Sequence, residues 1–394
     1  MKEPPVKRPT VLIFKEDLLP TSETFIEAQT NHLKAFAPRY IGLGRATPSL
    51  SVPSDSILLT SGRSPLATMK QKLYRRFGFA PVFHHNATSA KASLLHAHFA
   101  SGGRSALPLA RRLRIPLIVT LHGSDVTTRI NFRQRYEELW DKASIFVCVS
   151  EFIRRKAADA GFPEEKLRVL YTGIDSDVFQ PQPGPRNRNL LLFVGRLVAK
   201  KGCPFMLHAI AAVKRSYPSI QTVVIGDGPL RPSLEQLAAQ LGISCQFLGA
   251  QPAAVVRKWL CAARVFCAPS VTASNGDSEG LGMVFGEAQA MGTPVVSSRH
   301  GGIPEIVLDG RTGLLAPEGD SKTLALHILR FLKDEHFWKE CAERGADWVR
   351  TRFDLKFQTK QLEQIYMEVC LSTPTVDDPE HGDMESARIV ASHI

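Results

Sequence analysis

The sequence alternates short, mostly apolar runs with longer segments in which apolar residues recur at helical spacing. The runs are apolar on both alternating faces, which is typical of strands buried on both sides of a parallel sheet covered by helices. The expected strands lie at 11–14, 56–59, 94–98, 117–121, 145–149 and 169–171, and then at 190–194, 221–225, 245–248, 265–268 and 293–297. Because the strand–helix alternation occurs twice, the chain is predicted to be an α/β protein with two doubly wound domains.

A polar, proline-rich segment separates the two halves. Residues 181–189 are predicted to link a first domain, 1–180, to a second domain, 190–352. Helical periodicity returns at 353–371. The polar tail, 372–394, is expected to be disordered.

Composition excludes several classes of protein. No window holds the roughly 18 consecutive apolar residues of a membrane span, and the N-terminal segment lacks the apolar core of a secretory signal, so a cytoplasmic protein is expected. The seven cysteines are scattered, without CxxC or Cys/His metal spacing, so reduced thiols are expected. No nucleic-acid-binding module is recognisable, and nucleic acid is not an expected partner.

The positive charge is concentrated in the first half. Residues 1–180 contain 26 basic and 16 acidic side chains, whereas the remainder contains 23 and 22. One basic cluster consists of Lys70, Lys72, Arg75 and Arg76, beside Leu73, Tyr74, Phe77 and Phe79. Two interpretations stay open: a basic amphipathic helix that rests on anionic lipid at the inner face of the plasma membrane, or a solvated helix face.

Ligands of open parallel sheets bind beyond the carboxyl ends of the strands. After strand 190–194, Gly195 allows a tight turn, and Arg196, Lys200 and Lys201 bring cations to a helix start. Cations together with free backbone N–H groups suit a diphosphate, and a solvated basic turn is the alternative. Gly226 and Gly228, which follow strand 221–225, permit close approach of a ligand or of neighbouring backbone.

The segment 278–287 carries the strongest chemical signal. Glu279 lies in a glycine-containing loop that opens a helix, where the N–H groups of 280–282 (Gly280, Leu281 and Gly282) would be available to sugar hydroxyls or phosphate. Glu287 follows about two helical turns later and can face the same ligand. Its carboxylate suits the two vicinal hydroxyls of a ribose, and a helix-surface acid is the alternative.

Histidines end two strands of the first half. His122 follows strand 117–121 and is followed by Gly123 and Asp125, so it either faces the ligand or has a structural role. His96 and His98 form a pair that is compatible with metal binding, but no third ligand is apparent. No metal site is therefore predicted, and a packed or substrate-facing role is expected for the pair.

In their order and spacing, these segments resemble the family 4 glycosyltransferases, which have the GT-B fold of two Rossmann-like domains facing across a cleft. The resemblance covers roughly residues 90–320. It rests on 122–125, Gly173-Ile174-Asp175, 195–202, 226–229, the pair Glu279 and Glu287, 292–296 and 302–305.

The resemblance implies a retaining transfer of a hexosyl unit from a nucleotide sugar, with no metal or other cofactor. Arg196 and Lys201 would bind the donor diphosphate, with Gly226 and Gly228 nearby. Glu279 and the amides of 280–282 would meet the donor sugar. Glu287 would bind the ribose, His122 would lie near the reacting centre, and the final helix would cross back to the first domain.

The sequence departs from many family members after its first strand, where residues 18–25 contain no glycine. The Pro-x-Ser-Glu-Thr-Phe pattern there resembles the exopolysaccharide branch of the family, typified by colanic acid and amylovoran enzymes. It leaves Ser22, Glu23 and Thr24 as candidate contacts to a saccharide or lipid-linked saccharide acceptor, together with His98 and Asp125.

Two other functions are compatible with the same fold. One is a GT-B nucleotide-sugar epimerase or phosphorylase, and the other is a non-catalytic nucleotide-sugar binder. The presence of Arg196, Lys201, Glu279 and Glu287 argues against the second.

Overall fold

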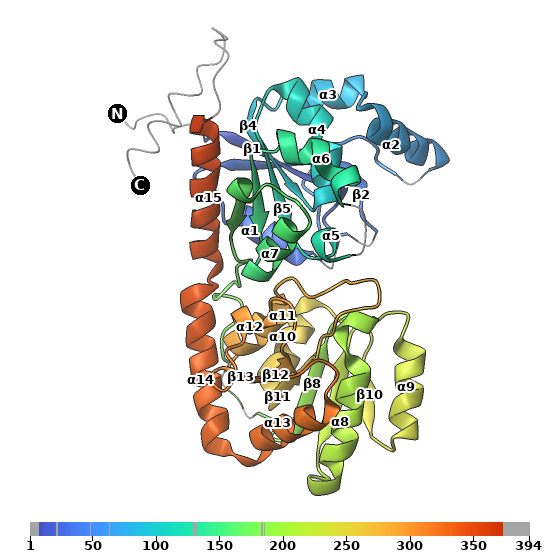
Figure 1. The fold of residues 1–394 in the computed structure, drawn as a ribbon, viewed down its shortest axis with the longest axis vertical. Coiled ribbons are helices and arrows are strands. Elements are labelled where there is room, and N and C mark those ends of the chain that lie inside the picture. The colour runs from blue at the N-terminus through green and yellow to red at the C-terminus, as the bar shows by residue number, and fades with distance from the viewer. Residues whose placement is uncertain are drawn as a thin grey trace.

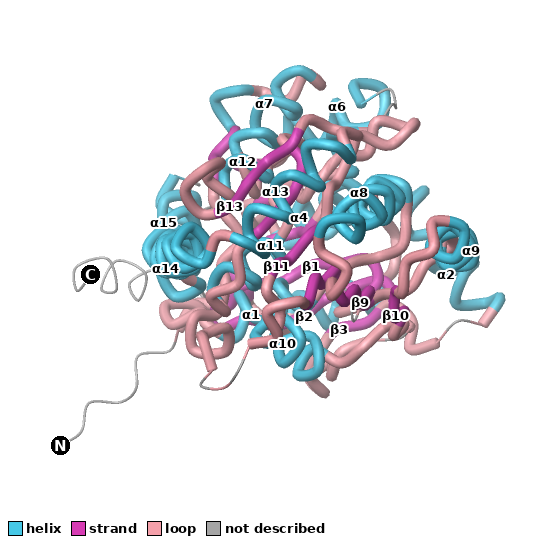
Figure 2. The backbone as a smooth tube through the Cα atoms, turned by 90° about the horizontal axis from the view of Figure 1, so that it is seen from below, coloured by secondary structure: helices cyan, strands magenta, loops and turns pink. Residues whose placement is uncertain are grey.

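The computed structural model describes residues 8–372, apart from 21–22, 48, 63, 129–131, 183 and 185. These residues form two parallel sheets, one above the other, with helices packed around each (Figure 1). Viewed along the long axis, most strands lie toward the middle and the helices around them (Figure 2). The α/β class and the two doubly wound sheets predicted from the sequence are confirmed.

The first sheet has seven strands in the order β3-β2-β1-β4-β5-β6-β7, all paired in parallel. The strands are β1 Thr10–Leu18, β2 Ala37–Arg45, β3 Ile57–Leu58, β4 Ala92–His98, β5 Leu117–Leu121, β6 Ile145–Cys148 and β7 Leu167–Val169. The helices are α1 Thr24–Asn31, α2 Pro65–Phe77, α3 Pro81–Thr88, α4 Ala100–Leu113, α5 Ser124–Thr127, α6 Phe132–Lys142 and α7 Glu151–Asp159. A 3-10 turn, η1, spans Glu164–Lys166.

The second sheet has six parallel strands in the order β10-β9-β8-β11-β12-β13. The strands are β8 Leu190–Val194, β9 Gln221–Ile225, β10 Cys245–Phe247, β11 Val265–Cys267, β12 Val295–Ser298 and β13 Gly313–Ala316. The helices are α8 Cys203–Ser216, α9 Arg231–Gln240, α10 Ala253–Ala262, α11 Met283–Ala290, α12 Ile303–Ile306 and α13 Ser321–Lys333, with a 3-10 turn, η2, at Ala199–Lys201.

Burial on both faces explains why the strands are readable in the sequence. In β1, Leu12 and Phe14 pack into the core on one side of the sheet, and Val11 and Ile13 into the core on the other. Strand β2 was missed because its proline, glycines and arginines interrupt the apolar pattern, and β13 because it is a four-residue strand that begins with glycine.

Two long helices, α14 Glu335–Arg352 and α15 Leu355–Ser372, run along one side of both domains (Figure 1). The Glu363 carboxylate on α15 accepts hydrogen bonds from the backbone N–H groups of Lys34, Ala35 and Phe36, at 2.8, 2.6 and 3.2 Å. The tail predicted at 372–394 lies outside the described residues, except Ser372, which ends α15. Among the helices of the described residues, none has the length and apolar character to cross a bilayer.

Direct contacts join the two domains where the carboxyl ends of their strands face each other. The Ser150 hydroxyl, after β6, donates to the Gly280 carbonyl at 2.6 Å. The Glu305 carboxylate accepts from the N–H groups of Glu151 and Phe152 at the start of α7, both at 2.8 Å. The loops that carry the predicted site residues therefore lie at this junction.

Candidate active site

An ion pair lies at the centre of the residues that the second domain contributes to the candidate site. Lys201 Nζ in η2 is 2.5 Å from the Glu279 carboxylate, and both side chains are mostly buried. Burial raises the pKa of Glu279, but Lys201 and Lys200 outweigh it and hold this pKa below its ordinary value. Lys200 is itself paired with Asp277 at 3.0 Å. The structure thus brings together Glu279 and Lys201, which are separated by 78 residues in the sequence.

A buried histidine fixes the backbone of Glu279. The N–H of Glu279 donates to His300 Nε2 at 3.1 Å, so Nδ1 of the same ring carries the proton and donates to Glu318 at 2.7 Å. The Glu318 carboxylate also accepts from the N–H of Thr272 at 2.8 Å. His300 and Glu318 therefore tie both ends of the 272–279 loop to the core. Sequence reasoning missed both residues, although His300 follows an expected strand and precedes two glycines.

The glycines at this site serve close backbone contacts. A side chain on Gly280 would collide with the carbonyl of His122 in the other domain. Gly226 has φ +135°, and a side chain there would collide with the carbonyl of Gly195. Of the two possibilities for Gly226, the structure displays a close approach to neighbouring backbone. A contact between the nucleotide-sugar donor and Gly226 or Gly228 stays a prediction.

Glu287 lies on α11 and is mostly buried, and its carboxylate forms no hydrogen bond or ion pair with any residue that the structure describes. Burial raises its pKa to about 7, and the nearby Arg257 offsets part of this effect. A buried carboxylate without donors is costly unless a ligand supplies them. This environment suits the predicted ribose contact better than it suits a helix-surface acid.

Arg196 follows β8 and is exposed, and its guanidinium makes no hydrogen bond or ion pair within the described part of the chain. Burial raises the pKa of Glu23 in the first domain, and Lys15 and, more weakly, Arg196 lower it, so Arg196 lies within electrostatic range of that carboxyl. Glu23 pairs with Lys15 Nζ at 3.2 Å, and Lys15 lies 3.9 Å from the centre of the Phe99 ring. Lys15 was not predicted; it lies late in β1, one residue after the expected strand 11–14.

Of the other acceptor candidates in this loop, Thr24 begins α1 and is exposed, and Ser22 falls outside the described residues.

Three histidines of the first domain, His96, His98 and His122, contact one another in series near this interdomain junction. His98 Nδ1 and His122 Nε2 are 3.1 Å apart, and their rings are stacked with centroids 5.3 Å apart. His96 hydrogen-bonds the Tyr366 hydroxyl at 2.6 Å and the Thr120 hydroxyl at 2.7 Å. Burial lowers the pKa of all three, that of His96 to about 3, so the row is neutral near pH 7.

His96 is therefore packed, while His98 reaches the junction through His122. Asp125 is also engaged by the protein: its carboxylate accepts from the N–H groups of His122, Gly123 and Ala100. It shapes the turn that carries His122, and acceptor contacts by His98 and Asp125 stay predictions. Between residues 8 and 372, leaving out the undescribed positions, no group of three or more His, Cys, Asp or Glu side chains has the arrangement of a metal site.

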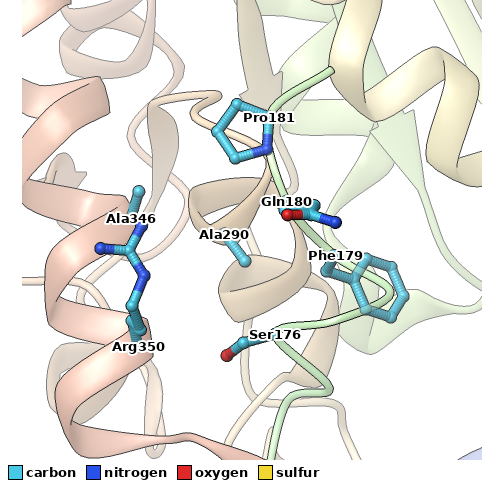
Figure 3. Close-up of a pocket in the computed structure, with 7 residues that line it drawn as sticks. All are labelled: Ser176, Phe179, Gln180, Pro181, Ala290, Ala346 and Arg350. Atoms are coloured by element: carbon cyan, nitrogen blue, oxygen red, sulfur yellow. The ribbon is translucent and has the colours of Figure 1, made fainter.

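A hollow of about 110 Å³ lies elsewhere, between the interdomain segment, α11 and α14 (Figure 3). Its lining residues are Ser176, Phe179, Gln180, Pro181, Ala290, Ala346 and Arg350. None of the predicted site residues lines this hollow.

Comparison with known proteins agrees with this arrangement. Residues 31–178 match the sequence profile described as Glycosyltransferase Family 4, and residues 188–334 match the profile described as Glycosyl transferases group 1. The amylovoran biosynthesis glycosyltransferase AmsK of Erwinia amylovora is 30% identical over 70% of this chain and 70% of its own length. WcaL of Escherichia coli, named as a colanic acid biosynthesis glycosyltransferase, is 31% identical over 62% of this chain and 63% of its own length.

A third relative is the GDP-mannose-dependent alpha-(1-6)-phosphatidylinositol monomannoside mannosyltransferase of Mycolicibacterium smegmatis. It is 30% identical over 66% of this chain and 72% of its own length. Among solved structures, HepE of Anabaena in complex with UDP and glucose has a TM-score of 0.74 at 18% identity, covering 92% of this chain and all of that one. The fold shared with this structure is GT-B.

Proposed function

Because the chain belongs to glycosyltransferase family 4 and is a glycosyltransferase, we propose that it moves a hexosyl unit from a nucleotide sugar to a saccharide or lipid-linked saccharide, with retention of configuration and without a metal ion. Names of relatives support a place in exopolysaccharide or glycolipid synthesis. The observation that carries the proposal is the Lys201–Glu279 ion pair beside the strand ends of the second sheet. Two further groups support it: the unpaired side chain of Arg196, which follows β8, and the Glu287 carboxylate on α11, whose pKa burial raises to about 7.

The cations would stabilise the leaving group. A departing nucleoside diphosphate gains negative charge, and preorganised positive groups lower the barrier for this kind of step. Arg196 and Lys201 provide such groups, and Lys201 also holds Glu279 ionised. An ionised carboxylate accepts hydrogen bonds from sugar hydroxyls, so the same pair can bind phosphate on one side and sugar on the other.

Retention follows if the acceptor hydroxyl attacks from the side on which the diphosphate leaves. The bond between the anomeric carbon and phosphate oxygen breaks, the acceptor oxygen bonds to that carbon, and the acceptor proton passes to the departing phosphate. Two first-domain carboxylates near this junction, Glu23 and Asp125, are held by Lys15 and by backbone N–H groups. Neither carboxylate is free to act as a nucleophile, which supports attack by the acceptor on the same face of the sugar from which the diphosphate departs.

Neutral His122 would act as a hydrogen-bonding group at the reacting centre. Its pKa lies well below the ordinary value because of burial and the nearby Lys15, so it carries no charge that would oppose a cationic sugar in the transition state. His98 supports the orientation of this ring.

The first test is a thermal-shift screen with UDP, GDP, ADP and CDP, each with and without its common sugars. A ligand that binds only the folded chain raises the melting temperature, so one nucleotide is expected to stand out. HepE was solved with UDP and the mycobacterial relative is named for GDP-mannose, so both are included. A shift that disappears in Glu287→Ala supports the donor site, whereas no shift with any nucleotide contradicts it.

Turnover is then measured with the matching nucleotide sugar and a membrane extract as the source of acceptor. Arg196→Ala is expected to lose at least a hundredfold in rate, whereas Arg215→Ala, an exposed arginine on α8, serves as the matched control. Activity that persists in excess EDTA and a product of unchanged anomeric configuration by NMR would support the proposal. A requirement for added metal, or an inverted product, would overturn the corresponding part.

A further inference from the structure

Helix α2 presents an apolar stripe to solvent. Leu66, Met69, Leu73 and Phe77 are 55, 51, 47 and 69% exposed. Their spacing of three or four residues places all four on one face of the helix. Ala67 and Tyr74, about 100° around the helix from the stripe, are buried and hold α2 against the domain. Four large apolar side chains in line are more than the scattered exposure of an ordinary surface.

The stripe continues past the end of the helix. Phe79, just before α3, and Val82, in the first turn of α3, are 72 and 74% exposed. Between them and α2, Gly78 turns the chain at φ +65°, and a side chain there would collide with Pro108 on α4. The corner is therefore held firmly on the domain, at the outer margin of the first sheet (Figure 1). We call Leu66, Met69, Leu73, Phe77, Phe79 and Val82 the α2–α3 patch.

Cations border the α2–α3 patch. By helical geometry Lys70 lies on one side of the stripe, and Lys72 and Arg76 on the other. Lys70 and Lys72 are exposed and have no ion-pair partner among the described residues. The surrounding sequence is strongly basic, because residues 56–124 contain ten lysines and arginines and no aspartate or glutamate.

We propose that the α2–α3 patch docks the enzyme on a bilayer that contains anionic phospholipids. An apolar stripe bordered by lysine and arginine is the arrangement that enters the headgroup region while its cations meet lipid phosphates. A protein partner fits less well, because protein interfaces are depleted in lysine relative to the rest of the protein surface. This proposal goes beyond sugar transfer, and its test does not use transferase activity. The docking proposal and the proposed transferase function can therefore fail independently of each other.

The experiment is vesicle flotation of the full chain with phosphatidylcholine vesicles, with and without phosphatidylglycerol. The protein is expected to float with the anionic vesicles only, and less as salt is raised. Lys70→Gln with Lys72→Gln should weaken binding at least tenfold, since each lysine near an anionic surface contributes about a fivefold change. Leu73→Asp with Phe77→Asp should abolish flotation.

The matched control uses α13 of the second domain, where Leu326 is 66% exposed and Lys322 is also exposed. Leu326→Asp with Lys322→Gln should float like the parent, and all variants should keep its melting temperature because these positions are exposed. Absence of binding to anionic vesicles, or an equal loss in the α13 control, would overturn the proposal. So would α2 variants that float normally but change a dimer into a monomer by light scattering, because the patch would then join two copies.

Discussion

Glu287 allows the proposed donor site to be tested through pH. In the folded chain its pKa lies at about 7 because burial opposes the charge. Between its ordinary pKa and pH 7, the folded chain keeps a proton that the unfolded chain has released. Stability therefore falls as pH rises through this window, and the loss is complete above pH 7, reaching at most about 3 kcal/mol.

Glu287→Gln removes this titration. The variant should match the parent in stability near pH 5 and exceed it by up to about 3 kcal/mol at pH 8. It should also bind the nucleotide sugar about 10- to 100-fold more weakly, because charge-assisted hydrogen bonds to the ribose contribute about 1.5–3 kcal/mol. A substitution that stabilises the free protein but weakens ligand binding is typical of a residue retained for binding.

Calorimetry supplies both measurements. Unfolding is compared at pH 5 and 8, and binding of the intact nucleotide sugar at pH 6, 7 and 8, a range in which its diphosphate does not titrate. The parent's affinity should rise about tenfold from pH 6 to 8, following the ionised fraction of Glu287, while the variant's affinity stays flat. Glu343→Gln, an exposed acid on α14, is the control. A pH-independent affinity in the parent, or equal stability changes at both pH values, would refute the reasoning.

Three further substitutions test the contacts that hold the site's framework. The Arg186 guanidinium donates to the carbonyls of Cys261, Ala263 and Met291, so Arg186→Ala should lower the free energy of unfolding, measured by urea titration, by roughly 3 kcal/mol or more. The control Arg188→Ala, at an exposed position, should change this free energy little. Equal effects of the two substitutions would contradict the prediction. Glu305→Ala removes the two hydrogen bonds to the start of α7, and small-angle scattering should show a larger radius of gyration; an unchanged radius would mean that other contacts suffice. Glu363→Ala leaves three backbone N–H groups without their acceptor, so hydrogen exchange at residues 34–36 should accelerate. Unchanged protection there would show that these hydrogen bonds to Glu363 do not hold the segment.

Local sequence determined most of the strands, though not β2 and β13, and the residue types of the site. Runs such as 190–194 and 221–225 were predicted with their observed bounds, because a strand buried on both faces must be apolar throughout. The motif residues were likewise visible because each follows such a run, and in a parallel sheet the carboxyl ends of the strands meet at one edge.

The tertiary structure decided which groups meet. Lys201 pairs with Glu279, His300 fixes the Glu279 amide, and Lys15 joins Glu23 beside Arg196, although nothing in the local pattern marks these partners. Asp125 looked available in the sequence, yet backbone donors occupy its carboxylate. These outcomes depend on how two sheets and their loops pack against each other. Spacing along the chain predicts which edge a residue reaches, and only the packing sets whether its side chain faces solvent, a partner or the site.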